Sequence, residues 1–272
     1  MNAITYALEF FKNQETEFYV LHAYQNEFYN HEKLVSREVF NDVLDAVSAQ
    51  SQKYLDRLLI QIKKIAPNPK FTFHTLSLYD TLVASVNLVA EAKDIDLIVM
   101  GTKGKSNERH IVFGSNTFQV LKYVQCPVLA IPSQYTHAKP KRLLFPTNYL
   151  IPYKRRELKL LSNLASTYNS VIDVLYVSQS DKLSIRQEDN QAFIKEIISN
   201  TDVNFYIEHD KKVVEAIQHY LSNNAIDMLV MVNSHQSFLE DMLFPTHIDR
   251  VSIALTIPLL ALQNAARTLR IE

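Results

Sequence analysis

The sequence predicts an α/β protein built from two similar halves, each with a parallel sheet covered by helices. Three observations lead to this fold class. Short runs of apolar and β-branched residues alternate with stretches of helical periodicity, as in strand–helix–strand units. A segment of the first half recurs in the second half. All three glycines of the 272-residue chain lie within one short window of the first half.

The repeat consists of residues 96–131 and 227–262, which align without a gap at an offset of 131 residues. Matching positions carry the same residue at several points, among them Asp96 and Asp227, Met100 and Met231, and Pro127 and Pro258. Such self-similarity marks a duplicated structural unit. We therefore expect two domains, residues 1–135 and 140–272, joined by a polar linker at 133–141.

The second half (residues 140–272) contains a complete series of elements. Its strands are expected at Arg142–Pro146, Val171–Ser178, Val203–Glu208, Asp227–Val232 and Ile257–Leu262. Its helices are expected at Tyr153–Tyr168, Gln187–Ser199, Lys211–Ser222 and Thr246–Ala254. This regular alternation favours a parallel sheet with helices on its faces.

The first half (residues 1–135) enters the same series late. Its strand Phe18–Tyr24 matches Ile172–Ser178, which places Met1 opposite Arg155, inside the first helix of the second half. No segment of the first half therefore corresponds to the strand Arg142–Pro146. We expect that the chain starts late relative to the natural protein; the alternative is that another segment takes the place of this strand.

The first half also contains a long helix and an edge strand. Apolar residues recur at helical spacing over His31–Ile65, which predicts one helix over that range. The apolar run Cys126–Ile131 and its counterpart Ile257–Leu262 are expected at sheet edges, where they could pair between the halves or between chains. Cys126 is the only cysteine, and its apolar neighbours favour a small buried side chain over a reactive thiol.

The glycine window holds Gly101, Gly104 and Gly114, where average usage of about 7% would spread roughly 19 glycines along the chain. Glycine permits positive φ and lets the backbone approach a ligand without a Cβ atom. The window joins the strand Leu97–Met100 to the helix Asn116–Tyr123, and free N–H groups at a helix start favour anions. The plainer alternative is an ordinary strand–loop–helix turn with a glycine stop.

Two common phosphate motifs do not fit this window. A Walker A loop ending at Gly104-Lys105-Ser106 would need its first glycine at Val99, and no G-x-G-x-x-G occurs. Lys103, Lys105 and Arg109 put positive charge in the loop. These cations either stabilise a triphosphate or form a solvated face, and the sequence does not decide between the two.

The spacing Gly101-x2-Gly104-x9-Gly114-Ser115, between DLIVMG and CPVLAIP, resembles the ATP-binding signature of the universal stress protein family. FYVLHAYQ and RLLFPTN resemble other strands of that family. The resemblance covers nearly the whole chain as a tandem member. It implies two Rossmann-like (HUP-type) domains of strand order 3-2-1-4-5, the first lacking its first strand, which is central in the family's sheet.

The resemblance also implies a nucleotide site in the first half, with ATP, with or without Mg²⁺, as the ligand. Residues expected to contact the phosphates are Gly104, Gly114, Ser115 and Asn116; those expected near the ribose and α-phosphate are Gly101 and Thr102; those expected to frame the adenine are Ala23 and Met100. The missing strand would also remove an aspartate loop, so the pocket could be incomplete and ATP absent.

The second half departs from the pattern. Val232, His235 and Pro245 stand at the glycine positions, Thr246 replaces the serine, and Asn148 replaces the aspartate of the first loop. Side chains there would obstruct phosphate, and proline has no N–H. We expect no ATP bound in this half.

Composition limits the remaining function classes. Lys and Arg number 28 against 29 Asp and Glu, so the basic excess of a nucleic-acid binder is missing. No apolar stretch reaches the ~20 residues of a membrane span, and a cytoplasmic location is expected. No catalytic set or metal-ligand set is visible, so we expect slow ATP hydrolysis at most. A regulatory nucleotide binder in a stress response is the first hypothesis. A nucleotide-free interaction module, built as an intramolecular pseudo-dimer, is the alternative; the protein partner and a homodimer stay open.

Overall fold

A computed structural model describes residues 1–34, 36–102, 113–151, 153–178, 182–209, 213–233 and 255–264. Strands alternate with helices and pair mostly in parallel, which confirms the α/β class. Two compact units divide the chain: Met1 with Ala3–Asp96, here the amino-terminal unit, and Asn2 with Leu97–Glu272, the carboxyl-terminal unit. The domain bounds 1–135 and 140–272 follow the repeat instead, and they stay a prediction.

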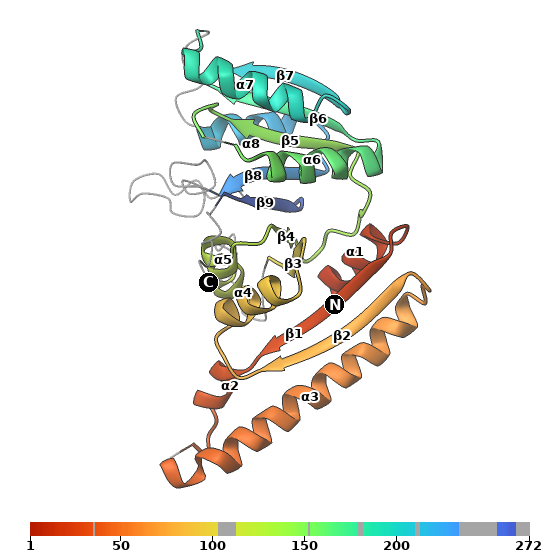
Figure 1. Cartoon of the computed structure of the whole chain (residues 1–272), viewed down its shortest axis with the longest axis vertical. Helices are drawn as coiled ribbons and strands as arrows, with labels where there is room; N and C mark the ends of the chain where they lie inside the picture. Colours follow the sequence, from red (N-terminus) through yellow and green to blue (C-terminus); the bar gives the residue numbers. More distant parts are fainter. Residues whose placement is uncertain are drawn as a thin grey trace. The chain divides into compact units, whose positions relative to one another are not determined.

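The amino-terminal unit is a pair of parallel strands with helices packed on them. Its elements are α1 (Asn2–Phe10), β1 (Thr16–Ala23), α2 (Gln25–Tyr29), η1 (Arg37–Val39), α3 (Phe40–Ile65), β2 (Phe71–Leu78) and α4 (Leu82–Ala92). The strands are in register from Thr16 opposite Phe71 to Ala23 opposite Leu78. The long helix α3 runs along both strands (Figure 1).

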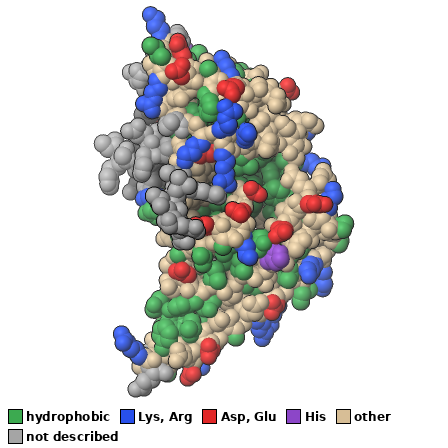
Figure 2. Space-filling view, viewed as in Figure 1, with side chains coloured by type: hydrophobic (Ala, Val, Ile, Leu, Met, Phe, Trp, Pro, Cys, Tyr) green, Lys and Arg blue, Asp and Glu red, His purple; other side chains and the backbone are tan. Residues whose placement is uncertain are grey.

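The single helix expected over His31–Ile65 is wrong at its start, because α3 begins only at Phe40. The reason is the ring of Phe28 in α2, which is fully buried. It packs edge-on against Phe40, with ring centroids 4.7 Å apart, and against Tyr79, at 5.2 Å. Burying this ring requires the chain to turn between α2 and α3. Partly buried hydrophobic side chains surround the cluster, and Figure 2 shows them at the surface over α2.

The carboxyl-terminal unit is built on one seven-stranded sheet. Its strands are β3 (Ile98–Gly101), β4 (Val128–Ile131), β5 (Arg142–Thr147), β6 (Val171–Val177), β7 (Asp202–Glu208), β8 (Met228–Asn233) and β9 (Leu259–Gln263). Its described helices are α5 (Ser115–Tyr123), α6 (Arg155–Tyr168), α7 (Ile185–Ile197) and α8 (Val213–Asn223). In Figure 1, α6 and α7 lie on the near face of the sheet and α8 on the far face. The helix expected at Thr246–Ala254 lies outside the described residues.

The order of the sheet is β3-β4-β9-β8-β5-β6-β7, so β5 lies between β6 and β8 and pairs with both. No described strand of the first half has the corresponding position. The four described strands of that half accordingly belong to two sheets: β1 and β2 form a sheet of their own, and β3 and β4 extend the sheet of the second half. This division agrees with the repeat comparison, in which no segment of the first half corresponds to β5.

The two halves meet through β4 and β9, the one antiparallel pair described in this sheet. Val128 lies opposite Ala261, and Leu129 opposite Leu260. These four side chains are fully buried. The expectation that the strands at Cys126–Ile131 and Ile257–Leu262 pair is confirmed, and they pair between the halves.

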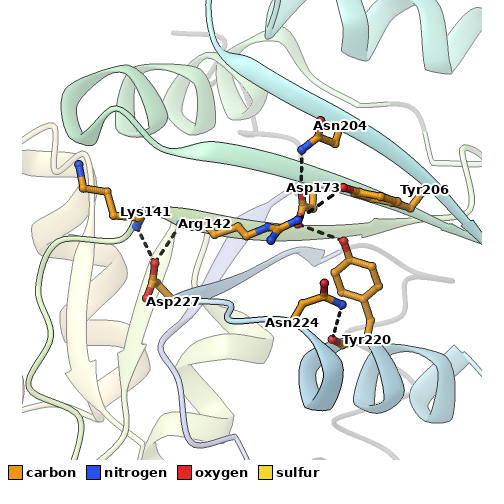
Figure 3. Close-up of polar contacts among 8 residues, drawn as sticks. All are labelled: Lys141, Arg142, Asp173, Asn204, Tyr206, Tyr220, Asn224 and Asp227. Carbon is orange, nitrogen blue, oxygen red and sulfur yellow. Dashed lines mark hydrogen bonds and ion pairs between the residues drawn. The ribbon is translucent and has the colours of Figure 1, made fainter.

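A buried carboxylate ties the amino ends of three strands to a helix (Figure 3). Asp173 on β6 is 0% exposed, and it accepts hydrogen bonds from Arg142 Nε on β5 (2.5 Å), Asn204 Nδ2 on β7 (3.1 Å) and the Tyr220 hydroxyl on α8 (3.1 Å). Burying a charge is tolerated only when it is paired and hydrogen-bonded. Nearby, Asp227 Oδ2 accepts the backbone N–H of Arg142 (2.9 Å), which fixes the start of β5.

Candidate functional site

The carboxyl end of β3 and the start of α5 are held together by three hydrogen bonds. Thr102 N donates to Ile131 O (2.9 Å), Gly114 N donates to Thr102 O (2.8 Å), and Thr117 Oγ1 donates to Gly101 O (2.7 Å). The predicted residues Gly101, Thr102 and Gly114 are therefore brought together. Thr117 was not among the predicted residues, although it is a hydroxyl residue in the first turn of the expected helix.

Among the residues that the structure describes, no side chain caps the first turn of α5. Its N-cap is Gly114, and the side chains of Ser115 and Asn116 are exposed. The N–H groups of an uncapped first turn are open to an external acceptor, and the helix dipole places partial positive charge there. The described residues of this junction therefore form a site suited to an anion.

Gly114 does not supply positive φ, because its φ is −63° and its ψ is 158°. Neither it nor Gly101 has positive φ. Any residue can adopt the Gly114 conformation, so the expectation that glycine provides positive φ is wrong at this position. What glycine contributes here is the missing Cβ atom, which leaves the backbone N–H groups accessible at close range.

The other end of α5 is fixed by the second half. The carbonyl oxygen of Leu121, in the last turn, accepts hydrogen bonds from Asn233 Nδ2 (2.7 Å) and Gln263 Nε2 (3.1 Å). Asn233 ends β8 and lies at the repeat position of Thr102. With both ends bonded, α5 presents its first turn on a rigid support, which lowers the ordering cost of binding a ligand.

The remaining predicted site residues are placed as follows. Met100 lies in β3, paired with Ala130. Ala23 is the last residue of β1 in the amino-terminal unit. Gly104 lies outside the described residues, as do Lys103, Lys105 and Arg109. The roles of these residues stay predictions.

In the second half, two tyrosines pack at the carboxyl ends of β5 and β6. Tyr149 is 1% exposed and stacks on Tyr176, with ring centroids 5.0 Å apart. Its φ of 56° is unusual for a bulky residue. Two hydrogen bonds hold this conformation: the Tyr149 N–H donates to Thr147 Oγ1 (2.9 Å), and Asn190 Nδ2 donates to the Tyr149 carbonyl oxygen (2.6 Å). The sequence comparison missed these rings. His235, Pro245 and Thr246 lie outside the described residues.

Glu157, in the first turn of α6, is a buried carboxyl group. It is 5% exposed, and neither carboxylate oxygen has a hydrogen-bond partner among the described residues. Burial raises the pKa of Glu157 to about 7, against the opposing charges of Lys154 and Arg156. A single Glu in a helix start gives no sequence signal of burial, so this group was not predicted.

Glu157 should make folding stability depend on pH. Because the pKa of Glu157 is higher in the folded state than in the unfolded state, protonation of Glu157 favours folding. This stabilisation is fully present below pH 4.5, the unfolded pKa, and is lost as pH rises through about 7, the folded pKa. We expect Glu157→Gln to raise the free energy of unfolding by about 1–3 kcal/mol at pH 8 and by little at pH 5. Urea denaturation at both pH values measures this, with Glu188→Gln on the exposed start of α7 as control. An equal gain at both pH values would contradict the assignment.

Comparison with known proteins identifies the family. Residues 1–132 match the model of the Universal stress protein family. The first half of this chain, residues 1–132, belongs to the universal stress protein family. A universal stress protein of Methanocaldococcus jannaschii is 37% identical over 84 residues, which cover 31% of this chain and 46% of that protein. The match therefore spans about half the length of that relative.

Solved structures show the same fold over nearly the whole chain. A universal stress protein from Archaeoglobus fulgidus has a TM-score of 0.68 at 16% identity, covering 97% of this chain and 94% of that chain. A functionally unknown protein from Pseudomonas aeruginosa has a TM-score of 0.54 at 11% identity, covering 97% and 95%. At these identities the likeness shows the fold alone.

Proposed function

We propose that this chain binds ATP or a related nucleoside triphosphate at the β3–α5 junction, as a regulatory ligand in a stress response. The observation that carries the proposal is the uncapped first turn of α5, begun by Gly114 and fixed at both ends of the helix. Phosphate oxygens would accept hydrogen bonds from the backbone N–H groups of Ser115 and Asn116. The family membership supports the same site.

A regulatory role is favoured over turnover by the residue types at the junction. The described residues of the junction, 101–102 and 113–117, contain no Asp, Glu or His that could act as a general base; Glu108 and His110 of the intervening loop lie outside the described residues. No group of three or more metal-ligating side chains occurs among the described residues. A Mg²⁺ ion would therefore arrive with the nucleotide and be held mainly by phosphate and water oxygens.

A second candidate function is an interaction module that works without nucleotide. It is favoured by the pairing of β4 with β9, which joins the two halves as a pseudo-dimer within one chain. The residue types at the glycine positions of the second half, Val232, His235 and Pro245, also favour a second half that binds no phosphate. No helix among the described residues has the length and apolarity needed to cross a bilayer.

Gly114→Asp separates nucleotide binding from helix stability, because it should act on them with opposite sign. An Asp at the N-cap accepts a first-turn N–H and complements the dipole, which should stabilise the nucleotide-free protein by about 0.5–1 kcal/mol. The same carboxylate should repel phosphate and abolish the ATP response. For the wild type, ATP at 100 times Kd should stabilise the fold by about 2.7 kcal/mol, a thermal shift of several degrees.

Thermal unfolding with and without Mg·ATP measures both effects. Gly114→Ser is the matched control, because it caps the helix without adding charge and should keep part of the ATP response. Binding stoichiometry by calorimetry should be one nucleotide per chain, since the second half is expected to bind none. A wild type that shows no shift and no heat would support the interaction module instead.

A further inference from the structure

Strand β1 has one paired edge and one edge whose backbone groups are open. Thr16 N donates to Lys70 O (3.0 Å) and Tyr24 N donates to Leu78 O (3.0 Å), so the even-numbered residues face β2. Alternate residues of a strand direct their N–H and C=O groups to opposite edges. The N–H groups of the odd-numbered residues Glu17, Tyr19, Leu21 and Ala23 therefore lie on the other edge. The described residues provide no backbone partner for them.

The second half shows what lies against this edge in the repeated unit. Tyr24 corresponds to Ser178, and Ser178 N donates to Glu208 O of β7 (3.1 Å), as Tyr24 N does to β2. Glu17 corresponds to Val171, and Val171 N donates to Lys141 O (2.9 Å), at the start of β5. The open edge of β1 therefore corresponds to the edge of β6 that pairs with β5.

The burial of the two strands differs accordingly. Every residue of β6 after Val171 is buried, and β6 is paired on both edges. No residue of β1 is buried, although its sequence FYVLHA is as apolar as a core strand. An apolar strand with an open edge is a template for strand addition.

We infer that the open edge of β1 binds an extended peptide segment in parallel, with a basic residue first and apolar residues after it. The pattern is that of β5, RLLFPT, whose Arg142 lies opposite Val171 of β6. In the same register a basic residue would lie opposite Glu17. The side chain of Glu17 is 65% exposed, accepts the Tyr19 hydroxyl (2.9 Å) and lies 3.8 Å from His74 Nε2 on β2. Its negative charge would attract a basic side chain placed opposite it.

The bound segment would complete the sheet of the amino-terminal unit by backbone pairing. Its N–H and C=O groups would bond those of Glu17, Tyr19, Leu21 and Ala23, and its apolar side chains would cover the strand faces. Affinity would come from the main-chain bonds, and preference from the basic first residue and the alternating apolar positions.

A synthetic peptide with the sequence of residues 141–148, KRLLFPTN, tests this on the full chain by fluorescence anisotropy. Because Lys141 O faces β6, the N–H groups of Leu143 and Phe145 lie on that same edge. N-methylation at those two peptide positions should weaken binding at least tenfold. N-methylation at the Leu144 position, on the opposite edge, should leave most of the binding intact and is the matched control.

Two further readouts locate the peptide. Amide exchange by NMR should slow on peptide addition at the odd-numbered residues of β1, while the even-numbered ones are protected from the start. Glu17→Lys should lower affinity several-fold, whereas Glu91→Lys on exposed α4 should not. Binding that ignores both N-methylations, or no binding at millimolar peptide, would overturn the inference. So would a stable dimer whose odd-numbered β1 amides are protected without peptide, since a second copy would then occupy the edge.

Discussion

Asp173→Ala should destabilise the second half by about 2–4 kcal/mol, because it removes the fully buried acceptor of three hydrogen bonds, while the Arg142 side chain, 34% exposed, stays partly hydrated. The loss leaves the Tyr220 hydroxyl without its acceptor inside the protein and removes the ion-pair partner of the Arg142 guanidinium. Urea denaturation followed by circular dichroism should show a lower midpoint with an unchanged slope. No other substitution on β6 removes as many side-chain bonds among the described residues.

A combined variant distinguishes charge pairing from simple loss of packing. Asp173→Val with Arg142→Leu and Tyr220→Phe replaces the network by apolar groups, and such replacements are often neutral or stabilising. We expect the triple variant to be more stable than Asp173→Ala alone. A triple variant as unstable as the single one would show that the hydrogen bonds of Asp173, which apolar side chains of similar volume cannot replace, hold this end of the sheet.

Leu260→Asp should separate the two halves, because it places an unpaired charge in the middle of the β4–β9 pair. Leu260 is fully buried opposite Leu129, so the carboxylate would have neither water nor a cation. The penalty is several kcal/mol. We expect the cooperative unfolding transition to split and limited proteolysis to cut between β4 and β5.

Ile207→Asp on β7 is the control for Leu260→Asp. Ile207 is 52% exposed on the edge strand at the other end of the sheet, so the same new charge stays hydrated there. Its effect should stay within about 0.5 kcal/mol. Equal losses for the two variants would mean that β4 and β9 do not hold the halves together.

The sequence predicted most strand positions to within one or two residues, because apolar alternation and the repeat both mark strands. It also placed Gly101 and Gly114 at one junction, since the residue after a parallel strand and the start of the next helix meet at the same sheet edge. The repeat further marked the two edge strands that pair as β4 and β9. These features follow from patterns that are local or duplicated in the chain.

Other features depend on contacts between distant residues, which no local pattern contains. Asp173 lies inside the apolar run VIDVLYV, and its partners are 31 to 47 residues away. A charge in a buried strand does signal that a partner must exist, but it does not say which one. The start of α3 was wrong because helical spacing of apolar residues does not reveal that Phe28 packs back on Phe40.

The antiparallel pair of β4 and β9 belongs to one chain, so its formation is a unimolecular event. For two strands on separate chains, the paired fraction would fall on dilution. For strands tethered in one chain, the effective concentration is about millimolar or higher and does not change with protein abundance. The association of the two halves is therefore insensitive to expression level, and a cell that makes few copies of the chain has the same joined sheet as one that makes many.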